Sequence, residues 1–297
     1  MSDDGRPNTW VRRMARLAGF RVACVLLGIM AICAAAPGLV VALSPATHDP
    51  NECSLRAPDG SYQDRLAPSG AHWFGTDTQG CDEFARVVFG ARTSLTIGLG
   101  AGMLMTVVGT ALGLVAGWRG GWADTMVRRL GDVTLGIPFV VGAILLLTVL
   151  VDERRSAEQI VVTFAVLLWP GAARIARSAT RGIAALPYIE ASRALGAGQF
   201  RIVMTHVLPN ALPMIVSFAT PTIGLLIAAE ATLSYLGIGL QIPAVSWGLM
   251  IDSAQAHYGS SPHLQLFPGA FLAATVASFI LLGDAMNDAL DPRRGEE

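Results

Sequence analysis

Few side chains in this sequence have the types and spacing that catalysis requires. All 21 basic residues are arginine, so the chain lacks the lysine of a phosphate-binding G-x-x-x-x-G-K-[ST] loop and does not hydrolyse ATP by that route. Its five histidines form no H-E-x-x-H pair, and none stands with cysteines or acids at zinc-ligand spacing. No Ser-His-Asp arrangement is evident. These patterns predict a protein that is not an enzyme and has no cofactor or metal of its own.

The most informative polar stretch covers residues 186–210, between two apolar segments. Pro187 suits a first helical turn, and Gly196 suits a helix end that needs a left-handed residue. A second short helix is expected at about 199–207, ending before Pro209 because proline interrupts a helix. The stretch therefore predicts a helix, a glycine turn and a second helix.

The composition predicts that these elements belong to a membrane protein. Of 297 residues, 53% are hydrophobic and 14% are charged, whereas soluble domains carry about 25% charged residues. The formal net charge of −1 gives no reason to expect nucleic-acid binding. A spanning helix needs roughly 20 mainly apolar residues. Six segments are long and apolar enough, at about 22–43, 94–118, 129–151, 159–175, 212–239 and 267–286.

The arginines indicate how these spans are oriented. Six crossings place both termini on one side, and fifteen arginines fall on that side against six on the other. The positive-inside rule therefore places both termini in the cytoplasm. The first apolar run is too long for a cleaved signal peptide, so it is expected to stay as an anchor. The predicted parts are a cytoplasmic basic tail (1–21), a first transmembrane helix (22–43), an extracytoplasmic loop (44–93), a five-helix core (94–290) with a cytoplasmic loop (186–210) and an extracytoplasmic segment (240–266), and a cytoplasmic tail (291–297).

Glycines in the second apolar segment predict close helix packing. Gly98 and Gly102, Gly109 and Gly113, and Gly113 and Gly117 stand at G-x-x-x-G spacing. Glycine at this spacing lets helix backbones approach closely in a membrane.

One acid and four cysteines carry the remaining polar or reactive groups of note. Glu230 lies near the outer end of the fifth span, where burying a carboxylate is costly. It is either part of a translocation path or outer gate, or a structural, hydrogen-bonded acid. Cys53 and Cys81 both fall in the first outside loop, where oxidation is permitted, and they form either a disulfide or two free thiols. Cys24 and Cys33 are expected to pack as small apolar residues.

Residues 186–210 resemble the EAA loop of binding-protein-dependent ABC importer permeases. In that family the pattern is E-A-A, three residues, G, nine residues, I-x-L-P. At the matching spacing this sequence has Glu190-Ala191-Ser192, Gly196, His206 and Leu208-Pro209. Ser192 replaces the second alanine, and His206 stands in place of isoleucine. A His-x-Leu-Pro-Asn ending is typical of the peptide and nickel branch.

The resemblance implies that this loop sits in a cleft of an ATPase subunit and transmits its closure to the spans. On this interpretation Glu190 makes a charged contact to the ATPase, whereas the alternative is an exposed carboxylate that pairs with Arg193 for a few tenths of a kcal/mol. Gly196 serves as a hinge, because alanine there would resist a positive φ angle. The residues assigned to the coupling loop are Tyr188, Glu190, Ala191, Ser192, Arg193, Gly196, Phe200, Leu208 and Pro209.

Other motifs resemble the C-type permease of oligopeptide and dipeptide importers. Residues 72–77 look like its H-x-[LF]-G-T-D segment. The family continues with G-R-D, whereas residues 80–82 here have Cys81 in place of arginine, which removes a cation. Further matches lie at 117–124, 233–239, 246–248 and 290–293.

This resemblance implies a type I ABC importer permease fold in the bacterial cytoplasmic (inner) membrane. The implied function is a permease subunit that imports oligopeptides or dipeptides, forms half of the translocation pathway and couples ATPase closure to alternating access. The implied partners are a homologous second permease, two ABC ATPase domains that hold ATP and magnesium, and an extracytoplasmic substrate-binding protein. The first outside loop and residues 240–266 would dock that binding protein.

Two alternatives stay open at this point. A nickel importer permease shares most of these motifs, and the sequence argues against it only in that the spans show no lining rich in histidine or acids. A stand-alone channel or membrane scaffold would have no ATPase partner. An embedded enzyme lacks a convergent set of acids, bases or metal ligands.

Overall fold

The computed structural model describes residues 18–46, 49–56, 60–149 and 156–290. Residues 1–17 of the basic tail, the arginines at 154–155 and the C-terminal tail lie outside the described residues, whereas residues 18–21 form the start of α2. Within them the chain is helical, apart from turns and three isolated β-bridges. The helices are α2 (Ala18–Ala35), α3 (Pro37–Val41), α4 (Glu83–Arg119), α5 (Gly121–Gly136), α6 (Phe139–Val149), α7 (Ala157–Ala184), α8 (Pro187–Ala194), α9 (Gln199–Ile202), the π-helical turn η1 (Val203–Val207), α10 (Leu208–Tyr235), α11 (Trp247–Ala254), the 3-10 turn η2 (Gln255–His257) and α12 (His263–Leu290).

Five helical stretches are long and apolar enough to cross a membrane. They are Ala18–Ala35, Glu83–Arg119, Ala157–Ala184, Gln199–Tyr235 and His263–Leu290. α5 and α6 pass the same test together but are bent by 90° relative to each other, the geometry of a broken span or of a re-entrant loop. The expectation of six spans is met when this bent pair counts as one, and the all-α membrane fold is confirmed.

The third span differs from the straight helix predicted at 129–151. α5 ends at Gly136, Ile137 is extended with φ −87° and ψ 120°, and α6 starts after Pro138. Proline has no N–H to donate, and it disfavours the helical conformation of the residue before it. The apolar run therefore predicted apolar helices here, but the prediction of one continuous helix was wrong.

Two further boundaries differ from the sequence-based ones. The first span breaks at Ala36, so that α2 and the short α3 replace one helix over 22–43. α4 begins at Glu83, well before residue 94, because the Asp82 side chain caps it by accepting a hydrogen bond from the Ala85 N–H (2.9 Å). Apolarity marks where lipid begins, whereas a capping side chain marks where the helix begins.

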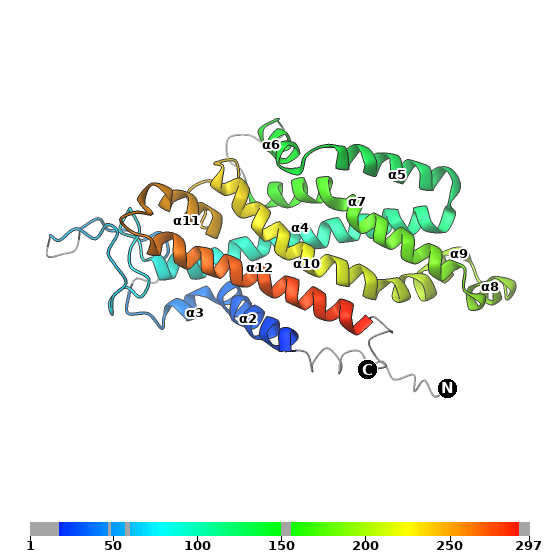
Figure 1. Ribbon diagram of the computed structural model, residues 1–297, viewed down its shortest axis with the longest axis horizontal. Coiled ribbons are helices and arrows are strands. Elements are labelled where there is room, and N and C mark those ends of the chain that lie inside the picture. Colours follow the sequence, from blue (N-terminus) through cyan, green and yellow to red (C-terminus); the bar gives the residue numbers. More distant parts are fainter. Residues whose placement is uncertain (1–17, 47–48, 57–59, 150–155, 291–297) are drawn as a thin grey trace.

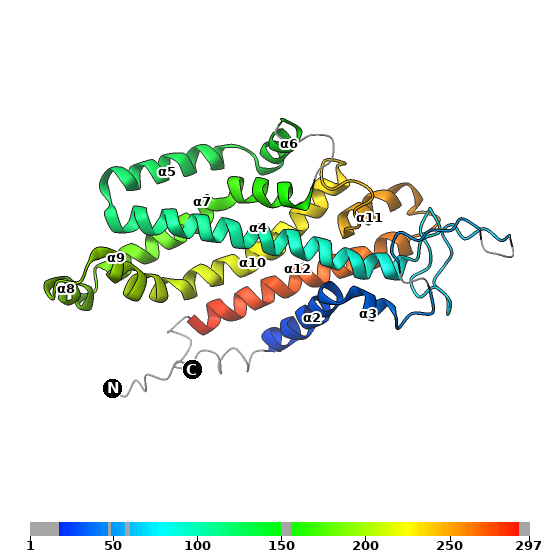
Figure 2. The ribbon, with the colours of Figure 1, turned by 180° about the vertical axis from the view of Figure 1, so that it is seen from behind.

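The long helices run along the longest axis of the molecule, with α4 in their midst (Figure 1). α8 lies at one end, and the segment before α4 lies at the other end together with α11 (Figures 1 and 2). α2 starts and α12 finishes toward the α8 end. This arrangement is the one expected when both termini lie on one side of the membrane.

Glycines allow α4 to touch its neighbours closely. A Cβ atom on Gly109 would lie 2.6 Å from the Cβ of Ala172, and one on Gly113 would lie 2.5 Å from a carbonyl oxygen of α7. Gly98 and Gly102 face α10 in the same way. The predicted close packing is confirmed, since no larger side chain fits between these backbones.

Candidate functional site

The coupling segment, residues 186–210, begins with the predicted helix and glycine turn. Pro187 is at the start of α8, where its missing N–H has no helical partner to lose. After α8 the chain turns at Gly196, whose φ angle is +82°. The Gly196 N–H donates to the Arg193 carbonyl (2.9 Å), and the Ala197 N–H donates to the Ser192 carbonyl (3.1 Å). The space around a Cβ atom on Gly196 is open, so only the backbone angle requires glycine.

The second part of the coupling segment differs from the prediction, because the helix does not stop before Pro209. α9 passes through the π-helical turn η1 directly into α10. In that turn the Leu208 N–H donates to the Val203 carbonyl, five residues back. The wider turn accommodates a proline that cannot donate, and single π turns of this kind occur frequently at functional sites. Residues 199–235 therefore form one helical stretch that joins the coupling segment to a membrane span.

A small apolar cluster attaches α8 to the rest of the molecule. It contains Leu114 of α4, Ile189 of α8, Ile202 of α9 and Val207 of η1, all buried. Because its members come from four elements, the cluster connects α8 to α4 and to the helical stretch that becomes α10.

Arg193 adds a second attachment, which the sequence did not predict. Its guanidinium carbon lies 4.6 Å from the centre of the Trp118 ring at the end of α4, and such cation–π contacts favour arginine. The ion pairs found among the described residues do not include one between Glu190 and Arg193. The pairing alternative for Glu190 is therefore not the arrangement present.

The coupling segment exposes large apolar side chains beside charged ones. Leu195 is 88% exposed and Phe200 is 79% exposed, and Tyr188 is also exposed. Large exposed apolar side chains beyond the spans are typical of a site for a protein partner. Sequence reasoning missed Leu195, although it directly precedes the glycine of the motif. Of the residues assigned to this loop, Ser192 and Leu208 are half-buried, and the exposed ones are Tyr188, Glu190, Ala191, Arg193, Gly196, Phe200 and Pro209.

Glu230 lies far from this segment and joins its own helix, α10, to α4 and to the start of α11. Its side chain is fully buried. It accepts hydrogen bonds from the hydroxyls of Ser234 in α10 (2.8 Å), Ser246 at the start of α11 (3.0 Å) and Ser94 in α4 (3.3 Å). Full burial with three donors is what the structural interpretation expects, since a gate residue would face a cavity.

Trp247 strengthens the junction around Glu230. The Trp247 backbone N–H donates to the Ser94 hydroxyl (3.3 Å), and its indole N–H donates to the Val87 carbonyl (2.9 Å). The side chain is fully buried against Gly90, where a Cβ atom would lie 3.2 Å from the indole. α11 is thereby fixed to the N-terminal part of α4.

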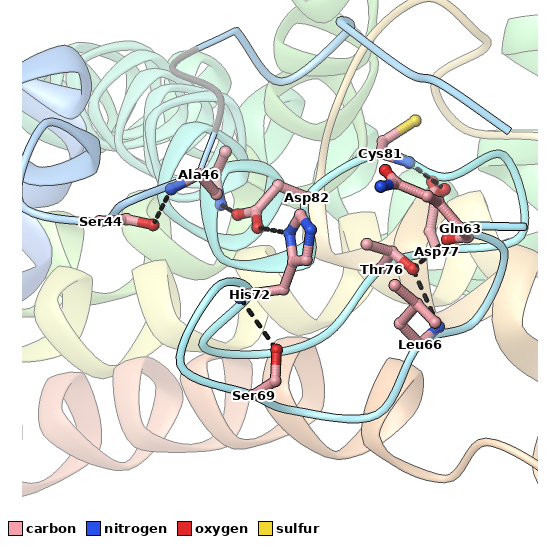
Figure 3. A network of polar contacts seen from close by, with 11 residues as sticks. Ser44, Ala46, Gln63, Leu66, Ser69, His72, Thr76, Asp77, Cys81 and Asp82 are labelled. Atoms are coloured by element: carbon pink, nitrogen blue, oxygen red, sulfur yellow. Dashed lines mark hydrogen bonds and ion pairs between the residues drawn. The ribbon is translucent and has the colours of Figure 1, made fainter. Parts of the chain in front are cut away.

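The segment before α4 is folded by short-range polar contacts (Figure 3). The His72 ring bonds Asp82 (2.9 Å), and the Thr76 hydroxyl accepts a hydrogen bond from the Leu66 N–H (2.9 Å). One oxygen of Asp77 accepts the Cys81 N–H (2.9 Å). These bonds tie the segment to the start of α4.

Within this segment, Cys53 and Cys81 take the disulfide alternative. Their sulfurs lie 1.95 Å apart. Arg86, in the first turns of α4, pairs with Asp77 and lies 3.3 Å from the Cys81 sulfur, so a cation stands beside the position where the family has arginine. The other two cysteines are free and lie on α2, one buried and one exposed. No group of three or more His, Cys, Asp or Glu side chains in the described part of the chain is arranged to hold a metal ion.

A bundle of membrane spans with the helical coupling segment at one end has the form of a membrane transport subunit. The chain belongs to the family described as "Binding-protein-dependent transport system inner membrane component", whose model matches residues 109–296. It is therefore a multi-pass permease subunit of an ABC importer in the inner membrane. Importers of this kind work with ATPase subunits and a substrate-binding protein.

Characterised relatives fall in the same class. The chain is 39% identical to the glutathione transport system permease protein GsiD of Pectobacterium atrosepticum, over 77% of this chain and 76% of that protein. It is 38% identical to the dipeptide transport system permease protein DppC of Bacillus subtilis, over 78% of this chain and 72% of that protein. The fold is similar to that of the MetNI methionine ABC transporter in an inward-facing conformation, with 24% identity and a TM-score of 0.53 over 69% of this chain and 96% of that one.

Proposed function

We propose that this permease imports dipeptides or oligopeptides, together with a homologous second permease, two ABC ATPase domains and an extracytoplasmic binding protein. The relatives named for dipeptide and glutathione transport support this class of cargo. The observation that carries the mechanism is the structure of the coupling segment. It exposes large apolar side chains, and its second helix is continuous with α10.

In this mechanism α8 sits in a cleft of one ATPase domain, where the exposed Leu195 and Phe200 side chains are covered. ATP and magnesium bind in the ATPase domains, not in this chain. Their closure displaces α8, and the cluster around Ile189 passes that displacement to α4 and α10. The spans then shift between two states, because ATP binding stabilises one of them more than the other.

The opposite end of the molecule is suited to receive the binding protein. Glu230 acts there as a structural acid that fixes α11, rather than as a gate. Large apolar side chains are exposed at this end of the molecule, among them Tyr62, Ile242 and Tyr258. The binding protein would dock on the segment before α4 and on residues 240–266, because exposed aromatic side chains on a well-packed surface suit a protein interface.

The experiment is uptake by the complete complex in proteoliposomes that contain the binding protein and ATP. We expect ATP-dependent accumulation of a radiolabelled dipeptide and none of radiolabelled nickel. Accumulation of nickel alone would show that the permease belongs to a nickel importer.

A second measurement tests the ATPase partner. We expect Leu195→Asp to lower co-purification of the ATPase subunits, because it places a charge on an apolar contact without disturbing the interior. Leu55→Asp, which changes an exposed leucine at the opposite end, is the matched control and should leave co-purification unchanged. Equal co-purification of both variants with the wild type would remove the support for a coupling role, and a wild-type chain that binds no ATPase would indicate a channel or scaffold.

A further inference from the structure

A charged groove lies between α5 and α7, apart from the coupling segment and from Glu230. We call it the α5–α7 groove. Its volume is about 400 Å³, and its lining includes Arg128, Asp132, Trp169, Arg174 and Arg177. Ligand pockets in proteins measure about 300–1,000 Å³, so the groove is large enough for a small molecule.

Part of this charge is structural. The buried carboxylate of Asp124 in α5 pairs with Arg177 and Arg181 of α7, the latter at 2.8 Å, and Arg128 lies 3.5 Å away. Arg177 bonds both carboxylate oxygens, the strong bidentate form of this contact. Asp124 therefore holds α5 against α7 and sets the width of the groove.

Arg174 and Asp132 are held differently. Their side chains are 63% and 64% exposed, and their charged atoms lie 3.2 Å apart. An exposed ion pair of this kind contributes about 0–1 kcal/mol to stability. The pair therefore has little structural value, and both groups are free to exchange partners with a ligand.

Both side chains of this pair are exposed, and Arg174 is one of the fifteen arginines assigned to the cytoplasmic side, so the groove is in contact with water. Charged side chains in membrane spans almost always face the bundle interior or a water-filled cavity, and they mark substrate pathways. Arg174 lies ten residues before the end of α7, about 15 Å from that end at the helical rise of about 1.5 Å per residue. The pair is thus nearer the α8 end than the outer end. α5 lies on the opposite side of the molecule from α2, the mostly exposed apolar span (Figures 1 and 2).

We propose that the α5–α7 groove contacts the peptide in the inner half of the pathway. There Arg174 binds the terminal carboxylate and Asp132 binds the terminal ammonium. This inference rests on the proposed function. A pair of opposite charges matches a zwitterion, and arginine binds carboxylates in a bidentate geometry. An anionic lipid headgroup would meet the Asp132 carboxylate beside Arg174 and is therefore the poorer match.

The test uses the complete complex in proteoliposomes, with saturating peptide-loaded binding protein. We expect Arg174→Gln and Asp132→Asn each to lower maximal dipeptide uptake by at least about fivefold, equivalent to about 1 kcal/mol. ATP hydrolysis stimulated by the binding protein should stay unchanged, because the groove is separate from the coupling segment. Arg129→Gln is the matched control, since Arg129 is an exposed arginine on α5 that does not line the groove, and its uptake should equal that of the wild type.

Unchanged uptake in Arg174→Gln or in Asp132→Asn, or ATP hydrolysis that falls in step with uptake, would each overturn the inference.

The lipid alternative is tested in vesicles of phosphatidylcholine with and without phosphatidylglycerol. We expect the Arg174→Gln defect to be the same in both. A defect that appears only with phosphatidylglycerol would assign the groove to a headgroup and overturn the inference. Absence of peptide uptake by the wild type would instead refute the proposed function itself.

Discussion

Replacing Gly196 by alanine should uncouple transport without preventing folding of the membrane spans. Gly196 has a φ angle of +82° with open space where a side chain would stand. The cost of Gly196→Ala therefore comes from the backbone angle alone, about 1–2 kcal/mol for a left-handed non-glycine residue. A cost of that size corresponds to a factor of about 5–30 in the population of the native turn.

We expect peptide uptake in proteoliposomes to fall by about 5- to 30-fold if α8 must keep its present angle to act. Asparagine tolerates the left-handed region better than alanine does, so Gly196→Asn should fall between the wild type and Gly196→Ala. The amount of protein inserted in the membrane should be equal in all three, because Gly196 is exposed and belongs to none of the apolar clusters.

The matched control is Gly198→Ala, two residues further on. Gly198 also has open space around it, but its φ angle is −64°, which alanine adopts without strain. Its uptake should equal that of the wild type. Full uptake by Gly196→Ala, or an equal loss in both alanine variants, would refute the reasoning from the backbone angle.

Three further predictions concern the interior and the outer segment. Glu230→Ala should lower the stability of the complex by about 1–3 kcal/mol, because it leaves buried hydroxyls without their acceptor; Glu230→Gln should be milder, and thermal unfolding in detergent would show whether it is. Cys53 and Cys81 should react with maleimide only after reduction, and labelling without reductant would contradict the bond. Replacing both with serine should lower the stability of the outer segment by about 3–4 kcal/mol for a loop of 28 residues, which faster proteolysis would show. Gly113→Leu should abolish assembly because its side chain meets the α7 backbone, whereas Gly28→Leu, with open space around it, should assemble normally; equal yields would contradict the close packing.

Much of the fold could be predicted because its signals are local. Apolar runs of sufficient length predict spans, since lipid accepts only helices whose backbone is satisfied internally. The glycine spacing of α4 predicted close packing. The break at Pro138 was also present in the sequence, because proline and the residue before it resist a continuous helix.

The candidate site was only partly predictable. The spacing of Glu190, Gly196 and Pro209 marked the coupling segment. The spacing left open how that segment joins the span, since a π-helical turn depends on the packing around it. The stacking of Arg193 on Trp118 was likewise outside what a local pattern contains.

The sequence by itself determined that this chain forms apolar spans with a helical coupling segment, because composition, periodicity and backbone restrictions act over neighbouring residues. Only the tertiary structure decided that Glu230 meets Ser94, 136 positions away, and that Asp124 joins Arg177, 53 positions away. Contacts between such distant residues depend on how helices pack in three dimensions, and the order of residues in one helix does not specify its neighbours.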